Sequence, residues 1–371
     1  MKTSRILSLA VALLLSLSVS CQSRPRTADD ENLRRDIAQM LLVGFRGTGI
    51  DDSPHIRRDV QTYRIGGVIL FEYDAPSHSR PRNIASPTQL RKLCDDLQAL
   101  STETLLIGID QEGGSVSRLK RQYGFPEFPG AAETAEAGYE SVRYAARTTA
   151  EQLRRAGINL NFAPCADVDI NPDCPVIGRL GRSFSPNPKV VTECASIWIE
   201  EQNKQHIISC LKHFPGHGSA SGDTHLGAVD VTTSWDTSEL RPYRLLAPNK
   251  AAMIMTSHVF NANLDTMPAT LSYNILTSLL RDSLHFQGVI VTDDLAMGAM
   301  VQQYSLDTML TLAILAGADL LCLSNNGTDY DPNIVPHAID IICKAVRSGH
   351  IPEERIHQSA TRIRALKQTL R

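Results

Sequence analysis

Residues 211–225 hold most of the side chains that could do chemistry at one place. This stretch contains three histidines, a lysine and an aspartate: Lys212, His213, His217, Asp223 and His225. Three glycines and a proline lie between them, so most of the stretch can form neither a helix nor a regular strand. The apolar run 207–211 leads into it and predicts a buried strand. We therefore expect a strand that delivers Lys212 and His213, followed by a shaped loop that ends at His225, because barrel enzymes keep their chemistry in loops at strand ends.

The same stretch resembles the signature of the β-N-acetylhexosaminidases of glycoside hydrolase family 3. That signature runs Lys-His-Phe-Pro-Gly-His-Gly and then Asp-x-His, and every fixed position is present here at 212–218 and 223–225. A single histidine in such a loop is more simply a solvated or capping residue, but the length of the match favours the family. The resemblance covers residues from about Asp30 to the C-terminus. It implies a (β/α)8 barrel that acts as an enzyme on amino sugars.

Two adjacent acids, Asp293 and Asp294, follow an apolar run that ends at Thr292. Residues 289–297 resemble the nucleophile segment of the family, in which a strand ends on the attacking aspartate, and this aligns with Asp293. A carboxylate suits that role because the sugar carbon becomes oxocarbenium-like in the transition state and an anion can trap it. The alternative is that both acids cap the helix that follows, since acids favour helix N-termini.

The resemblance implies that Asp223 and His225 together serve as the general acid and base. A histidine has an ordinary pKa of about 6.5, close to the pH at which most enzymes work. A neighbouring carboxylate would orient the ring and favour its charged form. The alternative is a hydrogen bond that only stabilises the loop, from a backbone amide to Asp223.

Other polar residues gather where the predicted strands end, and carboxyl ends of barrel strands share one rim. The resemblance places five of them on the non-reducing sugar: Asp110, Arg118, Arg182, Lys212 and His213. The alternative is a set of ion pairs across the rim. His217 is predicted to be a structural loop residue, and the role of His258 stays open. The sequence implies no metal and no organic cofactor.

Eight short apolar runs alternate with helical patterns and predict an α/β protein with a (β/α)8 TIM-type barrel as its single catalytic domain. The runs are 37–45, 66–71, 105–110, 158–163, 210–214, 251–258, 288–293 and 319–324. The predicted helices are 87–100, 139–156, 189–205, 240–247, 273–284, 305–316, 334–348 and 352–370. A doubly wound open sheet is the competing architecture, but no G-x-G-x-x-G follows the first strand. Only 47 residues follow Ser324, which predicts a single-domain member of the family.

The first residues predict export rather than a part of the fold. Two basic residues precede an apolar stretch, and residues 17–21 resemble a bacterial lipobox whose cysteine, Cys21, is lipidated. We expect a lipoprotein signal peptide over 1–21, a polar tether over 22–32 and the barrel domain over 33–371. The protein would then be exported and held at a membrane by its lipid, on the periplasmic or cell-surface side. An ordinary cleaved signal and an uncleaved anchor are the alternatives.

Composition limits the remaining partners and cysteine chemistry. The net charge is −3 among 371 residues, with no long basic run, which argues against a nucleic-acid partner. None of the eight cysteines forms a C-x-x-C motif. Cys165 and Cys174 flank a loop and could bridge, a question that sequence leaves open.

Three functions fit these observations. The first is a retaining exo-β-N-acetylglucosaminidase that acts on terminal β-linked N-acetylhexosamine, in peptidoglycan fragments or related glycans. The second is a β-glucosidase of the same family, although those enzymes generally lack the Asp-x-His loop. The third is a non-catalytic, sugar-binding surface lipoprotein, which would be expected to lack Asp293 or His225.

Overall fold

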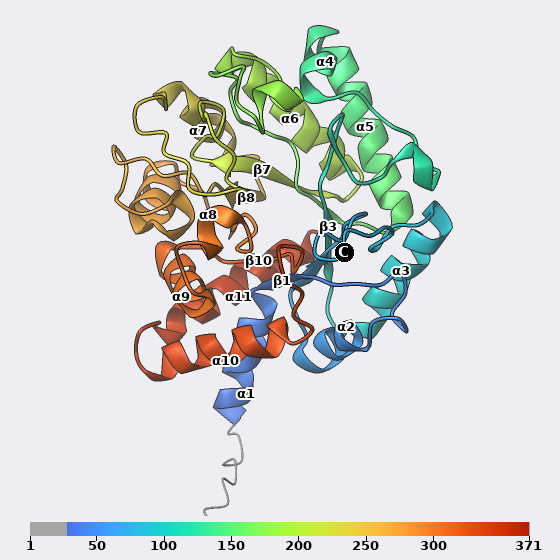
Figure 1. The fold of residues 1–371 in the computed structure, drawn as a ribbon, viewed down its shortest axis with the longest axis vertical. Coiled ribbons are helices and arrows are strands. Elements are labelled where there is room, and N and C mark those ends of the chain that lie inside the picture. Colours follow the sequence, from blue (N-terminus) through green and yellow to red (C-terminus); the bar gives the residue numbers. More distant parts are fainter. Residues whose placement is uncertain (1–27, 371) are drawn as a thin grey trace, which may run out of the picture.

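Eight parallel strands form a closed barrel inside a ring of helices (Figure 1). The structure is a computed structural model that describes residues 28–370. The barrel strands are β1 (Leu41–Gly44), β2 (Gly67–Ile69), β3 (Leu106–Ile109), β6 (Leu160–Asn161), β7 (Ile208–Phe214), β8 (Met253–Thr256), β9 (Val289–Val291) and β10 (Leu321–Leu323). They pair in the order β10-β1-β2-β3-β6-β7-β8-β9, and a parallel bridge from Val291 to Leu320 closes the ring. The predicted (β/α)8 barrel is confirmed, and the open doubly wound sheet is wrong because the sheet has no free edges.

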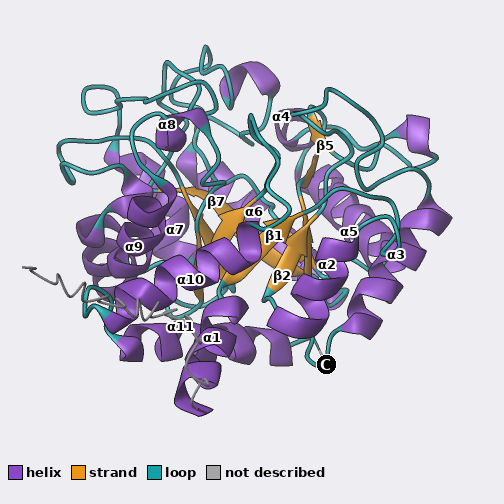
Figure 2. Ribbon diagram, turned by 60° about the horizontal axis from the view of Figure 1, so that its bottom comes forward, coloured by secondary structure: helices purple, strands orange, loops and turns teal. Residues whose placement is uncertain are grey.

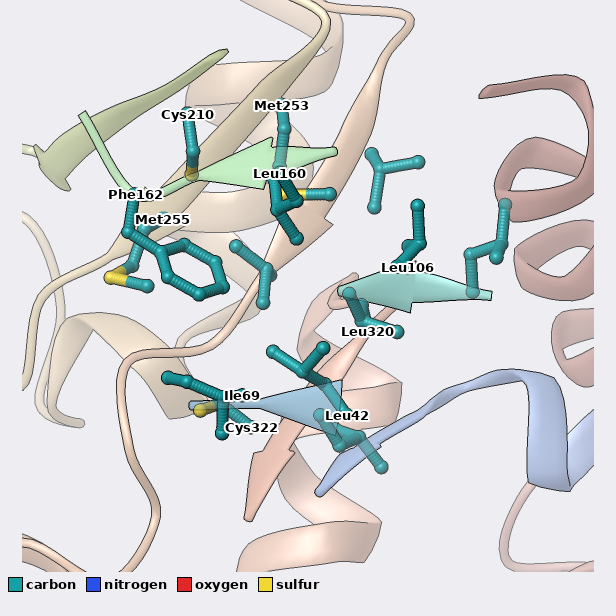
Figure 3. Close-up of a cluster of buried hydrophobic side chains, with 14 of the residues drawn as sticks. Leu42, Ile69, Leu106, Leu160, Phe162, Cys210, Met253, Met255, Leu320 and Cys322 are labelled. Atoms are coloured by element: carbon teal, nitrogen blue, oxygen red, sulfur yellow. The ribbon is translucent and has the colours of Figure 1, made fainter. Parts of the chain in front are cut away.

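Apolar side chains from strands all round the ring meet in its centre (Figure 3). The labelled members are Leu42, Ile69, Leu106, Leu160, Phe162, Cys210, Met253, Met255, Leu320 and Cys322, and none is more than 4% exposed. The strands are buried on both faces, because the helices cover the outside of the ring. This explains why the sequence shows continuous apolar runs instead of an alternation of apolar and polar residues.

Eleven α-helices surround the barrel within residues 28–370, and local chemistry favours the start of α3 and the end of α5. They are α1 (Ala28–Gln39), α2 (Pro54–Arg58), α3 (Pro87–Leu100), α4 (Ala131–Glu136), α5 (Tyr139–Ala156), α6 (Pro188–Lys204), α7 (Arg241–Leu246), α8 (Gly298–Val301), α9 (Leu306–Ala316), α10 (Ile334–Arg347) and α11 (Glu353–Gln368). Ser86 caps α3 as predicted: its hydroxyl accepts the amide of Gln89 at 3.2 Å. Gly157 ends α5 with φ 81°, a conformation that favours glycine.

One predicted boundary is wrong. Helix α1 begins at Ala28, so residues 28–32 of the predicted tether belong to the folded domain. Acidic residues in its first turn favour a helix there, and one of them, Asp30, pairs with Arg347 of α10. The predicted helix 273–284 is confirmed, and residues 274–283 of it form a π-helix, η6. Apolar spacing reveals a buried helical face and not its hydrogen-bond pattern.

The loops that follow the strands gather on one side of the molecule, at the top of Figure 2, opposite α1 and the end of α11. Because the strands are parallel, this side carries all of their carboxyl ends. Within residues 28–370, no helix is both long and apolar enough to cross a bilayer. Cys165 and Cys174 are both buried free thiols, so the bridge that the sequence left open does not form.

Candidate active site

A cavity of about 460 Å³ opens at the carboxyl ends of the strands. All eight predicted site residues line it: Asp110, Arg118, Arg182, Lys212, His213, Asp223, His225 and Asp293. Lys212 and His213 lie at the end of β7, and the others lie in the loops after β3, β6, β7 and β9, so the barrel brings together residues that lie far apart in the sequence. This placement is what the shared rim of a (β/α)8 barrel predicts.

Asp293 follows β9 and faces the cavity as an ionised carboxylate. Its Oδ1 accepts the amide of Asp294 at 2.8 Å. Burial alone would raise the pKa of Asp293, but the imidazoles of His258, His213 and His225 lower it below the ordinary value. The group is therefore charged at neutral pH and available as a nucleophile.

Asp294 is used differently from its neighbour. Its carboxylate accepts the amides of Ser324 at 3.0 Å and Ala296 at 3.1 Å, which ties the segment after β9 to the end of β10. Burial raises its pKa. The role left open for His258 becomes structural: its Nε2 donates to the carbonyl of Asp294 at 2.9 Å, and its Nδ1 hydrogen-bonds Thr270 at 2.8 Å. The position of Asp293 thus depends on contacts made by the residue after it.

Asp223 and His225 form a contacting pair at the mouth of the cavity. The distance from His225 Nδ1 to Asp223 Oδ1 is 2.7 Å, and the same oxygen accepts the His225 amide at 2.8 Å. A carboxylate at Nδ1 places the proton there and leaves Nε2 free to face a substrate. The amides of Gly298 and Ala299, at the start of α8, donate to the carbonyls of His225 (3.1 Å) and Thr224 (3.0 Å). These bonds join the loop to the segment that follows Asp293.

His217 supports this loop from beneath, as predicted. It is 3% exposed, its amide donates to Asp167 at 2.8 Å, and its Nε2 lies 3.3 Å from the Thr224 hydroxyl. Burial lowers the pKa of His217 to about 4, so the ring is neutral at working pH. His217 therefore fixes the residue between Asp223 and His225 without adding a charge.

The sugar-binding candidates form one network of buried charges. Lys212 Nζ lies 2.7 Å from both Asp110 and Glu112, and Arg182 contacts both Glu112 oxygens at 2.8 and 2.9 Å. Burial alone would raise the pKa of Glu112, but Arg182 and Lys212 lower it to about 2. Arg118 lies at the edge, 3.6 Å from Asp110. Sugar binding and ion pairing across the rim are therefore compatible roles, because these side chains pair with one another and still line the cavity.

His213 is held in one orientation by a buried acid. Its Nδ1 lies 2.6 Å from Asp167 Oδ2, and its Nε2 lies 3.4 Å from Arg182. Burial alone would raise the pKa of Asp167, but the neighbouring His213 lowers it below its ordinary range. Cys165, Asp167 and His213 are the described residues that come near enough together to hold a metal ion, within 4.8 Å. All three are buried, and Asp167 already accepts bonds from His213 and His217.

Sequence reasoning gave no role to Glu112, and it placed Asp167 at the end of the fourth strand without a role. Each lies just beyond a predicted strand, which was a signal that could have been followed. Their partners are remote: Glu112 and Arg182 are 70 positions apart, and Asp167 and His213 are 46 apart. Only the closure of the barrel shows that these pairs meet.

Comparison with known proteins decides the family. Residues 32–366 match the Glycosyl hydrolase family 3 N terminal domain. The chain belongs to glycoside hydrolase family 3. It is 34% identical over 272 residues to a β-hexosaminidase of Neisseria meningitidis serogroup B, covering 70% of this chain and 72% of that one. A β-hexosaminidase of Alkalilimnicola ehrlichii is 33% identical, with 81% and 84% covered.

Solved structures agree with this assignment. A family 3 β-N-acetylglucosaminidase from a Paenibacillus species superposes with a TM-score of 0.82 at 34% identity, over 91% of this chain and 62% of that one. A β-N-acetylhexosaminidase from Beutenbergia cavernae gives a TM-score of 0.80 at 26% identity, over 91% and 98%. This family 3 glycoside hydrolase therefore shares its barrel both with longer proteins and with proteins of similar length.

Proposed function

We propose that this protein is a retaining exo-β-N-acetylglucosaminidase that releases terminal β-linked N-acetylglucosamine from glycans. One observation carries the proposal: the ionised Asp293 and the Asp223–His225 pair line a single cavity together with the charged network around Lys212. The names of the relatives support the choice of an N-acetylhexosamine over glucose.

The reaction proceeds in two displacements. An Asp293 oxygen attacks the anomeric carbon while His225, as the imidazolium, donates its Nε2 proton to the departing glycosidic oxygen, which gives a covalent glycosyl-enzyme, a free alcohol and a neutral imidazole with its proton on Nδ1. Water then attacks the same carbon, His225 accepts its proton, and the Asp293 carboxylate is released. Two inversions at one carbon leave the product with the β configuration of the substrate.

The exo mode follows from the shape of the site. The barrel beneath the cavity is filled by apolar side chains, so a sugar that enters can extend only toward the mouth (Figure 3). Asp110 accepts hydrogen bonds from sugar hydroxyls, and Lys212, Arg182 and Arg118 donate them. The terminal residue is thereby held between this network and Asp293.

The test compares nitrophenyl β-N-acetylglucosaminide with the matching β-glucoside. We expect efficient turnover of the first and little of the second, and proton NMR should show the β-anomer as the first-formed product. Preference for the glucoside would favour the family 3 β-glucosidase. An initial α-anomer would exclude retention, and no turnover of either substrate would favour a sugar-binding protein.

We further propose that the natural substrates are peptidoglycan fragments or related glycans and that a lipid on Cys21 holds the exported protein at a membrane. Cys21 lies outside the described residues, so the support comes from the lipobox-like sequence alone. We expect the native protein to partition into detergent and Cys21→Ser to become soluble or stay uncleaved. Equal partitioning together with equal cleavage of the two proteins would rule out the lipid.

A further inference from the structure

Helix α8 and the residue that follows it donate hydrogen bonds to three consecutive carbonyls of the loop that carries His225. The pairs are Ala299 N to Thr224 O at 3.0 Å, Gly298 N to His225 O at 3.1 Å and Gln302 Nε2 to Leu226 O at 2.9 Å. Two of the donors are backbone amides, which almost any residue supplies. The third donor is a side chain, so this bond depends on the residue at position 302.

The loop is largely exposed to solvent. Among residues 223–226, Thr224 is buried, whereas the His225 side chain is 63% exposed and Leu226 is 77% exposed. A segment with few buried contacts opens locally at a low cost in free energy. The bonds from α8 are therefore important for keeping this loop in one position.

The loop also packs directly against Gly298. A Cβ at this position would lie 2.5 Å from the carbonyl oxygen of His225 and 2.9 Å from the carbonyl carbon of Leu226. Both are backbone atoms, which cannot rotate away as the end of a flexible side chain can. Glycine is needed here for the close approach and not for an unusual backbone, since Gly298 is the first residue of a helix. A larger residue would push the loop away from α8.

The same short helix is joined to the nucleophile. Four residues separate Asp293 from Gly298. This segment is anchored to the end of β10, because Asp294 accepts the amide of Ser324 at 3.0 Å and the Leu295 amide donates to a carbonyl of β10 at 3.1 Å. Helix α8 therefore connects an anchored strand end, which carries the nucleophile, to the loop that carries the acid and base. A misplacement of about 1 Å between reacting groups can cost roughly 100-fold in rate.

We propose that Gln302 is a positioning residue for proton transfer: together with Gly298 it holds the loop on α8 and so keeps His225 at the glycosidic oxygen. The inference rests on the proposed function, because it assigns Gln302 an effect that passes through His225. Gln302 is not among the described residues that line the cavity, so it does not act on the sugar directly. Its effect should appear where protonation of the leaving group limits the rate.

The experiment compares Gln302→Glu with Gln303→Glu. The first variant keeps the shape of the side chain but removes the N–H donor to Leu226. Gln303 is the matched control, because it is also exposed and adds the same charge, but its Nε2 donates at 3.3 Å to the carbonyl of Ala299 in α8 instead of to the loop.

We expect Gln302→Glu to lower kcat/KM roughly tenfold on β-N-acetylglucosaminides with poor leaving groups, as for loss of one hydrogen bond. Activated aryl glycosides should lose much less, and Gln303→Glu should change neither class of substrate. Gln302→Lys retains an N–H donor and should recover most of the lost activity. Kinetics of Gln302→Glu that match those of Gln303→Glu overturn the inference.

A double-mutant cycle shows whether the effect passes through His225. In a His225→Ala background, Gln302→Glu should cause no further loss, because the loop then carries no acid and base to position. Equal losses in the two backgrounds would also overturn the inference, since Gln302 would then act only on the general stability of the fold.

Gly298→Ala tests the same contact without a change of charge. We expect a loss of roughly 100-fold on substrates with poor leaving groups. Gly49→Ala is its control and should be unchanged, because a Cβ at Gly49 would lie at an ordinary 3.6 Å from Asp52 Oδ2. If Gly298→Ala folds and has wild-type kinetics, the inference is overturned, and if it does not fold, the Gln302 variants decide. Failure of the wild type on nitrophenyl β-N-acetylglucosaminide would instead overturn the proposed function.

Discussion

At the scale of single residues, Asp293 and Asp294 show how neighbours with the same side chain take different roles. Asp293 faces the cavity, and its pKa is lowered by imidazoles around it. Asp294 accepts the amide of Ser324, at the end of β10, and the amide of Ala296 in its own segment, and burial raises its pKa. The difference comes from where each side chain points at the end of β9.

We predict that Asp293→Ala loses activity by at least roughly 1,000-fold, because no other carboxylate occupies the place of the nucleophile. Asp294→Ala should keep more activity but lower the free energy of unfolding by about 1–3 kcal/mol, since two amides lose their acceptor. Steady-state kinetics and urea unfolding measure the two effects. A reversed order of activities would assign the nucleophile to Asp294.

For His225→Ala we predict the largest losses on substrates with poor leaving groups, roughly 100-fold or more, because these need protonation. Activated aryl glycosides should lose less in the first step, so the glycosyl-enzyme should accumulate and be visible by mass spectrometry. Asp223→Ala should show a milder form, since the ring remains without its orienting partner. Equal slowing across the leaving-group series, with no trapped intermediate, would give the acid/base role to another residue.

Phosphate provides a separate test of His225 as the acid/base. An imidazole does not repel an anion that approaches the glycosyl-enzyme, whereas a carboxylate acid/base would. We predict that phosphate competes with water as the acceptor in the wild type, which product analysis by mass spectrometry would detect as a sugar phosphate. Release of free sugar alone at high phosphate would contradict this prediction.

At the scale of elements, the segment after β7 depends on a buried acid behind it. Glu239 is 0% exposed, and its Oε2 accepts the amide of Gly218 at 2.8 Å. Gly216 has φ 129°, and a Cβ there would lie 2.6 Å from Glu239. Both the positive φ and the close approach of Glu239 require glycine at position 216. Glu239 therefore packs directly against the segment that leads to Asp223 and His225.

Burial raises the pKa of Glu239 to about 8, well above an unfolded value of about 4.3. A raised folded pKa contributes stability that is full below the unfolded value and is lost as the pH rises through about 8. We therefore predict that Glu239→Gln melts at a higher temperature than the wild type at pH 9, and that their difference shrinks toward pH 5. Calorimetry at both pH values, with the exposed Glu136→Gln as a control, would measure it. A difference that does not vary with pH would refute the assignment.

At the scale of the whole molecule, stability resides in the apolar centre of the barrel (Figure 3). Leu106 is 0% exposed there, whereas Leu245 of α7 is 53% exposed. We predict that Leu106→Ala lowers the free energy of unfolding by about 2–5 kcal/mol through lost burial and the cavity left behind. Leu245→Ala should change it by less than about 1 kcal/mol. Urea denaturation of both variants provides the measurement, and similar effects at the two positions would mean that the centre is loosely packed.

The sequence by itself determined the barrel and the residues that line its mouth. Strands buried on both faces are apolar throughout, so each of the eight apolar runs could be recognised as a strand without knowing which strands it pairs with. The string from Lys212 to His225 and the acid at the end of the seventh run were local features, and all eight candidates lie around one cavity. Local signals also fixed helix ends such as Ser86 and Gly157.

Only the tertiary structure decided which charges meet. Glu112 with Arg182, and Asp167 with His213, are contacts between loops of different strands, and no periodicity in the chain records them. The start of α1 at Ala28 belongs here too, since Arg347 of α10, far along the chain, helps to hold its first turn. Apolar burial is a property of each segment, whereas the pairing of charges depends on the distances that folding sets.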